Sequence, residues 1–248
     1  MGLFKKIIAG GLGWTLGGPI GAIIGVTLAS LFDNNKTVEY QRVETDDRMR
    51  NSSRGANDFQ IVLLVLMAAV VKADGRVVKD ELSVVKRFLI QNYGEESARE
   101  AWQILNQLLK QNINVSEVAT QCSLRLNYSV RLQLLSMLFS VAAGDGEVNV
   151  AEVAVIKNIA HYMRVTEADL SSISAMFTKQ SNPDWAYQVL ELSPNCTDDD
   201  IKKAYRRMAM KYHPDKVNSL GEEVKQNATE KFRKVKEAYD YLKKQRGI

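Results

Sequence analysis

The sequence predicts an all-α fold with three parts: a glycine-rich N-terminal membrane helix, a helical bundle and a C-terminal helical hairpin. Only four of the 248 residues are prolines, and Leu, Ala, Lys and Glu, which favour helices, are frequent. An uncharged stretch occupies residues 7–32, and from residue 58 onward apolar residues recur at helical spacing. The hydrophobic content of 46% and the charged content of 25% are those of an ordinary globular chain.

The N-terminal segment, residues 1–32, is predicted to be a transmembrane anchor. As a helix, its uncharged stretch would span roughly 39 Å at a rise of ~1.5 Å per residue. That length exceeds the ~30 Å hydrocarbon core of a bilayer. Lys5 and Lys6 resemble the start of a signal peptide, but no small-x-small cleavage site follows the apolar stretch.

Glycines recur every four residues along the predicted anchor. They are Gly13, Gly17, Gly21 and Gly25. Because glycines on one helix face let a second backbone approach closely in lipid, they predict a homodimer through the membrane helix. The alternative is that glycine is simply common in membrane helices. Pro19 predicts a kink, and a re-entrant hairpin is the alternative to a full span.

The flanking charges bear on orientation. Two lysines precede the uncharged stretch and alone would keep the N-terminus in the cytoplasm. Four arginines follow the stretch and outnumber them: Arg42, Arg48, Arg50 and Arg54. The positive-inside rule applied to the arginines places the C-terminal part in the cytoplasm.

A polar linker is predicted at 33–57, followed by a helical domain at 58–178 and a second short linker at 179–183. Asp58 is a candidate N-cap for a helix whose apolar positions start at Phe59. The further predicted helices cover 79–91, 95–111, 127–143, 150–162 and 167–178. Thr166, with Asp169 three residues later, has the chemistry of a helix N-cap.

The helical domain contains a weak internal repeat of the pattern D-G-x-V-x-x-x-E between apolar helices. Its acidic residues are Asp74, Glu81, Asp145 and Glu152. The repeat resembles the TerB-like domain of tellurite-resistance-associated proteins, and that resemblance implies a metal-binding role for these four residues. The alternative is that they cap helices or lie in first turns, where the helix dipole favours carboxylates. The sequence lacks the ladder of oxygen ligands of an EF-hand.

The C-terminal domain, residues 184–248, is predicted to be an antiparallel helical hairpin. Thr197 caps a helix that ends before His213-Pro214-Asp215, because proline cannot continue the hydrogen-bond ladder. A third helix runs from about residue 222 to 244, so the tripeptide is expected at the exposed tip of the hairpin. One face of the capped helix carries five cations and no acidic residue: Lys202, Lys203, Arg206, Arg207 and Lys211.

These residues resemble the J-domain of the DnaJ family. The matching elements are Tyr187-x-Val189-Leu190, the run from Ile201 to Arg206, the run from Tyr212 to Lys216, and Phe232, Glu237-Ala238-Tyr239 and Leu242. The resemblance implies that His213, Pro214 and Asp215 dock on an ATP-bound DnaK-type chaperone and promote ATP hydrolysis there. It also implies that the basic face steers the domain onto an acidic surface of that chaperone. A net charge of +4 without a recognised DNA-binding motif does not favour a nucleic-acid partner.

No catalytic or cofactor motif is found. Cys122 and Cys196 form no CxxC pair, which excludes a zinc module and suits a reducing compartment. The two histidines, His161 and His213, have no nucleophile or metal ligand at a matching spacing, and no phosphate-binding loop occurs. We therefore expect neither an enzyme nor a bound cofactor.

The order of anchor, TerB-like domain and C-terminal J-domain resembles the DjlA family of bacterial membrane-anchored co-chaperones. That resemblance implies a single-pass inner-membrane protein whose bulk lies in the cytoplasm, where DnaK and ATP are found. The alternative is a membrane scaffold for stress or metal responses that acts through its TerB-like domain. Neutralising the four acidic residues of the repeat would abolish function only in the second case.

Overall fold

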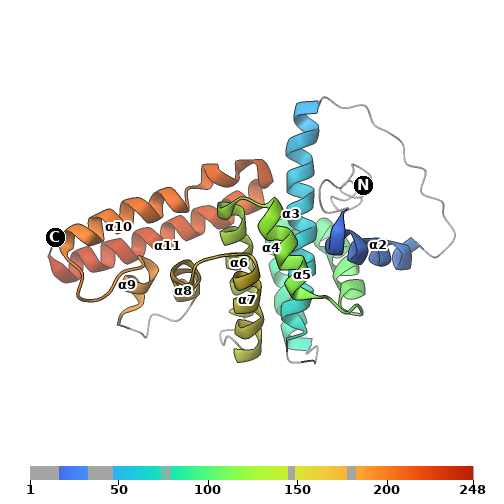
Figure 1. Ribbon diagram of the computed structural model, residues 1–248, viewed down its shortest axis with the longest axis horizontal. Coiled ribbons are helices and arrows are strands. Elements are labelled where there is room, and N and C mark those ends of the chain that lie inside the picture. Colours follow the sequence, from blue (N-terminus) through green and yellow to red (C-terminus); the bar gives the residue numbers. More distant parts are fainter. Residues whose placement is uncertain are drawn as a thin grey trace.

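A computed structural model describes residues 17–32, 47–73, 75, 79–144, 149–177 and 183–247. These residues form helices and connecting turns and contain no strand, so the predicted all-α class is confirmed. Two bodies lie side by side: a helical bundle, and a hairpin that extends away from it (Figure 1). After the families that their sequences resemble, we call the bundle from α3 to α8 the TerB domain and the part from α9 to α11 the J-domain.

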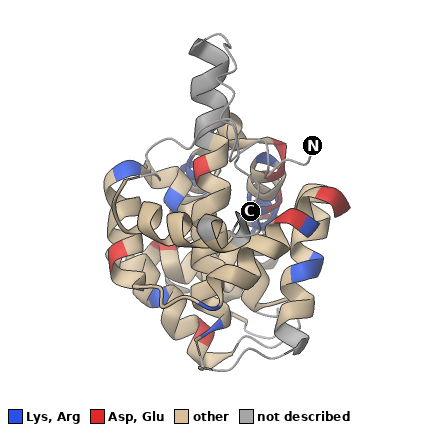
Figure 2. Ribbon diagram, turned by 90° about the vertical axis from the view of Figure 1, so that its right-hand side faces the viewer, with Lys and Arg blue, Asp and Glu red and all other residues tan. Residues whose placement is uncertain are grey.

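The described part of the TerB domain contains six helices. They are α3 (Asp47–Val71), α4 (Lys79–Leu108), α5 (Val115–Arg125), α6 (Tyr128–Ala142), α7 (Val150–Tyr162) and α8 (Glu167–Ala175). Every residue from 58 to 71 is buried, so the second half of α3 is covered on all sides. It packs against α4, α6 and α7 and forms the centre of the domain. Viewed along the long axis from the bundle end, the ribbon is mainly tan with scattered charges (Figure 2).

The start of α3 differs from the prediction. The helix begins at Asp47, inside the segment predicted as a linker, because no proline interrupts the polar residues before its apolar half. Asp58 is therefore no N-cap; it lies inside α3 and is 2% exposed.

Helix α5 was not predicted. Its 11 residues bury only Val118, Ala119 and Cys122, which is a weak apolar stripe. The local signal that could have revealed it is Asn114, whose side chain accepts a hydrogen bond from the Glu117 N–H at the start of the helix.

The predicted break at Gly94 is present as a kink. There α4 changes direction at a backbone with φ of 72° and ψ of 167°, which favours glycine. The predicted cap is also present, since Thr166 accepts a hydrogen bond from the Asp169 N–H at the start of α8.

Helix α2 (Gly18–Phe32) lies on the TerB domain, against α4 and α5. Ile20 and Ile24 are buried there. Gln121 of α5 donates from Nε2 to the Gly17 carbonyl (2.6 Å) and accepts from the Ile20 N–H (3.0 Å). Within the described ranges, no helix is both long and apolar enough to cross a bilayer. Residues 1–16 of the predicted anchor, including Gly13, lie outside those ranges.

The J-domain consists of α9 (Trp185–Val189), α10 (Asp198–Lys211), the short 3₁₀ segment η2 (Pro214–Leu220) and α11 (Glu222–Arg246). Helices α10 and α11 form the predicted hairpin. Thr197 and Asp200 form a reciprocal capping box at the start of α10. Inside the hairpin, Tyr205 stacks on Tyr239 with ring centroids 4.3 Å apart.

Candidate chaperone-binding site

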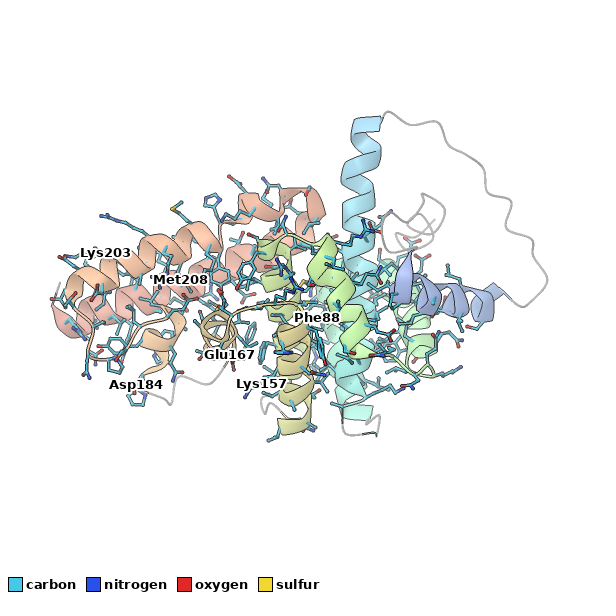
Figure 3. The ribbon with its side chains drawn as sticks, in the orientation of Figure 1. Phe88, Lys157, Glu167, Asp184, Lys203 and Met208 are labelled. Carbon is cyan, nitrogen blue, oxygen red and sulfur yellow. The ribbon has the colours of Figure 1, made fainter. Side chains whose placement is uncertain are left out.

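Helix α10 presents a cationic surface because most of its apolar residues face α11. Ile201, Ala204 and Met208 are buried in the hairpin. Lys202, Lys203, Arg206 and Arg207 are exposed on the other side. Figure 3 shows Lys203 on the outer side of α10 and Met208 on the side toward α11. We call the four exposed cations the basic stripe.

The His213-Pro214-Asp215 turn follows directly on α10. His213 has extended backbone angles (φ −62°, ψ 129°), and its Nδ1 accepts a hydrogen bond from the Asp215 N–H (3.3 Å). Pro214 occupies the first position of η2, where its missing N–H costs nothing. The His213 ring also meets Phe232 of α11 edge-on, at 6.2 Å between centroids. The turn is thus fixed by a cap, a proline and a ring contact.

The side chains of the turn point into solvent. His213 is 51% exposed and Asp215 is 72% exposed. The Asp215 carboxylate accepts a hydrogen bond from Asn218 Nδ2 (3.3 Å), which orients it within η2. A partner can therefore reach both groups directly, as the sequence predicts.

The base of η2 lies against the TerB domain rather than in solvent. Val217 and Leu220 are buried, and η2 packs against α3 and α6 as well as α11. The expected exposure of the tripeptide is seen in the His213 and Asp215 side chains, while the following part of the turn is packed on the TerB domain. The reason lies in tertiary packing, because Val217 and Leu220, the apolar residues of the turn, are buried where η2 packs on α3 and α6.

The five predicted cations differ in how closely carboxylates hold them. Lys211 is bound by two carboxylates, Asp169 Oδ1 at 2.7 Å and Glu191 Oε1 at 2.8 Å. Burial alone would lower the pKa of Lys211, but hydrogen bonds and charge from these carboxylates raise it above its ordinary value. Arg207 makes a looser contact with Glu191 at 3.4 Å. Elsewhere in the described structure, no ion pair holds Lys202, Lys203 or Arg206.

Met210 was missed by the sequence analysis. It is 70% exposed, and on α10 it lies one turn after Arg206 and Arg207 on the basic stripe. Its spacing of three and four residues from these arginines is the sequence signal that could have placed it on the same helix face. Its side chain adds an apolar contact to an otherwise cationic surface.

The four acidic residues predicted to bind metal are mostly outside the described structure. This holds for Asp74 and Asp145 and for the side chain of Glu81. Glu152 is 7% exposed in the first turn of α7, where the helix dipole favours a carboxylate. Among the described residues, no group of three or more metal-binding side chains occurs. The metal site stays a prediction.

Three protein-family models match successive parts of the chain. The co-chaperone DjlA transmembrane domain matches residues 1–52, tellurite resistance protein TerB matches residues 60–175, and the DnaJ domain matches residues 185–247. The order of the three matches is the order predicted from the sequence.

Curated relatives agree with these matches. The chain is 27% identical over 270 residues to co-chaperone protein DjlA of Coxiella burnetii, with both chains covered completely. It is 24% identical over 278 residues to co-chaperone protein DjlA of Photobacterium profundum, covering 99% of this chain and 100% of the relative. A chaperone protein DnaJ of Fusobacterium nucleatum subsp. polymorphum is 50% identical over 56 residues, 23% of this chain and 14% of its own. No solved structure matches.

The hairpin, the tripeptide and the DnaJ-domain match over residues 185–247 support a co-chaperone of the J-domain class. Along its whole length the chain resembles the co-chaperone DjlA, and its successive parts match the models of the DjlA transmembrane domain, TerB and the DnaJ domain. The predicted resemblance is thereby confirmed. The transmembrane-domain match and these relatives indicate a membrane-anchored bacterial protein.

Proposed function

We propose that this chain stimulates the ATPase of a DnaK-type chaperone and recruits that chaperone to the bacterial inner membrane. The observation that carries the proposal is the fixed turn of His213, Pro214 and Asp215, exposed at the end of the basic stripe. The proposed contact residues are those predicted from the sequence: the tripeptide, Lys202, Lys203, Arg206, Arg207 and Lys211.

The two parts of the site have different tasks. The basic stripe attracts an acidic surface and accelerates encounter, an effect that salt weakens. The turn then binds one conformation of the chaperone better than another. A ligand can shift a conformational equilibrium only by such a difference in affinity. The bonds of ATP are broken in the chaperone's own active site, and this chain needs only to favour the hydrolysing conformation.

In the proposed function, the N-terminal anchor holds this activity at the membrane. In the described part of α2, Gly25 has open space within 4 Å of the position a Cβ would occupy, so the helix face that carries Gly25 is not covered by the TerB domain. That supports the proposal that the anchors of two chains pack through their glycine face. The proposed orientation is single-pass, with the TerB domain and J-domain in the cytoplasm.

Flotation of vesicles tests recruitment. The full chain is reconstituted in vesicles of bacterial phospholipids and mixed with a bacterial DnaK and ATP. We expect the chaperone to float with vesicles that carry the wild-type chain. Vesicles carrying His213→Gln are the matched control, since the anchor and the basic stripe are unchanged. Equal recruitment by the variant, or by empty vesicles, contradicts the proposal.

A further inference from the structure

The J-domain is docked on the TerB domain along three lines of contact. Helix α9 packs on α8, η2 packs on α3, and α11 packs on α6. One hydrophobic core continues through both domains. The hairpin therefore touches the TerB domain with the end that carries the tripeptide, while its other end, beside the C-terminus, extends away from the bundle (Figure 1).

An ion-pair cluster links the two domains. Asp169 of α8 and Glu191 of the J-domain bind the same Lys211 ammonium. The Asp169 side chain is only 5% exposed and also accepts hydrogen bonds from Tyr128 (2.6 Å) and Thr166 (2.7 Å). The TerB domain thus supplies a fixed carboxylate that holds a cation of the predicted chaperone surface.

Two further lysines of α11 are turned toward the TerB domain. Lys231 is 3% exposed and donates to the Leu132 carbonyl at 3.3 Å. Lys234 donates to the Met176 carbonyl at 2.6 Å, and its ammonium lies 4.2 Å from the centre of the Phe177 ring. In a separate J-domain these two ammonium groups would lie in water. Docking on the TerB domain dehydrates them.

Lys231 weakens the docking. Its partners are a carbonyl and the face of Tyr212, 5.5 Å from the ring centre, and no carboxylate pairs with it in the described part of the chain. A buried ammonium without a counter-charge loses hydration that such partners do not fully replace. An apolar side chain at this position would make a tighter interface. The interface is thus extensive but contains one residue, Lys231, that destabilises it. Such a combination is expected of a contact that opens.

Docking also affects access to the tripeptide. A partner that binds His213, Asp215 and the basic stripe together must fit beside α3 and α6, which η2 touches. It must also do without Lys211, whose ammonium is held by Asp169. While the domains are docked, Lys211 is thus engaged, and a partner must approach the exposed His213 and Asp215 side chains beside α3 and α6.

We propose that the TerB domain restrains its own J-domain, and that release of the Asp169–Lys211 latch increases the J-domain's action on the chaperone. This inference rests on the proposed function and adds its regulation. Because the apparent affinity of a partner scales with the fraction of competent molecules, a shift toward the released state appears as tighter apparent binding.

Two substitutions test the inference in opposite directions in the full chain. Asp169→Asn removes the charge that holds Lys211 and leaves the proposed contact residues intact. We expect it to lower the concentration needed for half-maximal stimulation of DnaK ATP turnover by up to about tenfold. Lys231→Met removes the dehydrated cation, tightens docking and should raise that concentration. Tyr128→Phe is the matched control, because it removes a hydrogen bond from the same Asp169 carboxylate but leaves the Lys211 pair.

Backbone amide hydrogen exchange in η2 and α8 reports docking without the chaperone. We expect faster exchange in Asp169→Asn, slower exchange in Lys231→Met and little change in Tyr128→Phe. Faster exchange in Asp169→Asn without a gain in stimulation overturns the restraint, and unchanged exchange overturns the latch. If no protein stimulates turnover although exchange changes as expected, the proposed function fails and the regulation with it.

Discussion

At the scale of single residues, Asp169 makes the junction of the two domains sensitive to acid. Burial alone would raise its pKa, but hydrogen bonds from Lys211, Tyr128 and Thr166 outweigh burial and hold the pKa below its ordinary value. A carboxyl group whose pKa is lower in the folded than in the unfolded chain stabilises the fold above the unfolded pKa. That stabilisation is lost as the pH falls through the folded pKa.

We therefore expect the thermal midpoint of the full chain to fall as the pH drops below about 4, with Asp169 contributing to the slope. The measurement is a series of thermal unfolding curves from neutral to acidic pH. Asp169→Asn should start from a lower midpoint and lose less of it on acidification. A variant that follows the wild-type curve in parallel would show that Asp169 does not contribute.

Lys231 has the opposite relation to pH. Burial lowers its pKa well below the ordinary value, so the unfolded chain binds the proton more readily than the folded chain. Its destabilising effect is greatest below this lowered pKa, and it fades as the pH rises from there toward the ordinary lysine pKa.

Lys231→Met should stabilise the chain by roughly 1–3 kcal/mol at pH 7, because it removes a buried polar group that is poorly compensated. Denaturant unfolding at pH 7 and pH 9 measures the effect, with a smaller gain expected at pH 9. Lys236→Met, an exposed position on the same helix, is the control and should be close to neutral. A destabilised Lys231→Met variant would mean that the ammonium contributes more than its burial costs.

At the scale of helices, local chemistry explains where α10 begins. Thr197 accepts a hydrogen bond from the Asp200 N–H, and the Asp200 carboxylate accepts one from the Thr197 N–H. Thr197→Ala should therefore cost about 1 kcal/mol of stability, measured by denaturant unfolding. Thr197→Ser keeps the hydroxyl and should retain most of the stability. Equal losses in both variants would assign the effect to the threonine methyl group rather than to the cap.

The basic stripe on α10 should act mainly on the rate of encounter. Arg206→Glu reverses one exposed charge and should slow association with DnaK several-fold at low salt, and much less at high salt. Stopped-flow association at two ionic strengths measures this. Charge reversal at the exposed Arg125 of α5, in the TerB domain, is the control. A rate that does not depend on salt in either protein would exclude electrostatic steering.

Sequence reasoning succeeds at this scale where the signal is local. The breaks at Gly94 and at Pro214 and the caps at Thr166 and Thr197 each depend on residues within a few positions. Helix α5 was missed because its apolar stripe is short. The helical start of α3 was missed because a polar stretch without proline is compatible with either a linker or a helix.

At the scale of the whole molecule, the domain order could be predicted, but the docking of the domains could not. The basic face and the tripeptide follow from the sequence of residues 197–215. The capture of Lys211 by Asp169 joins residues 42 positions apart, and the burial of Lys231 depends on a carbonyl 99 positions away. Contacts of this kind depend on how the two domains pack together. Neither the apolar periodicity nor the capping residues of the sequence reveal that packing.

The arrangement also links the proposed site to the rest of the chain. The tripeptide end of the hairpin touches α3, and α3 is the central helix of the TerB domain. The N-terminal α2 lies on α4 and α5 of that same domain. The TerB domain is therefore in contact with both the N-terminal helix α2 and the J-domain, so a change in its structure can reach either one.

The central claim is that His213, Pro214 and Asp215 act on a DnaK-type chaperone. Single-turnover ATP hydrolysis by DnaK, measured with the full wild-type chain or with His213→Gln, tests it most directly. We expect the wild type to accelerate hydrolysis by about tenfold or more, equivalent to ~1.4 kcal/mol of barrier. The variant, folded with an unchanged thermal midpoint, should leave the chaperone at its own rate. A His213→Gln chain that stimulates as well as the wild type would contradict the claim.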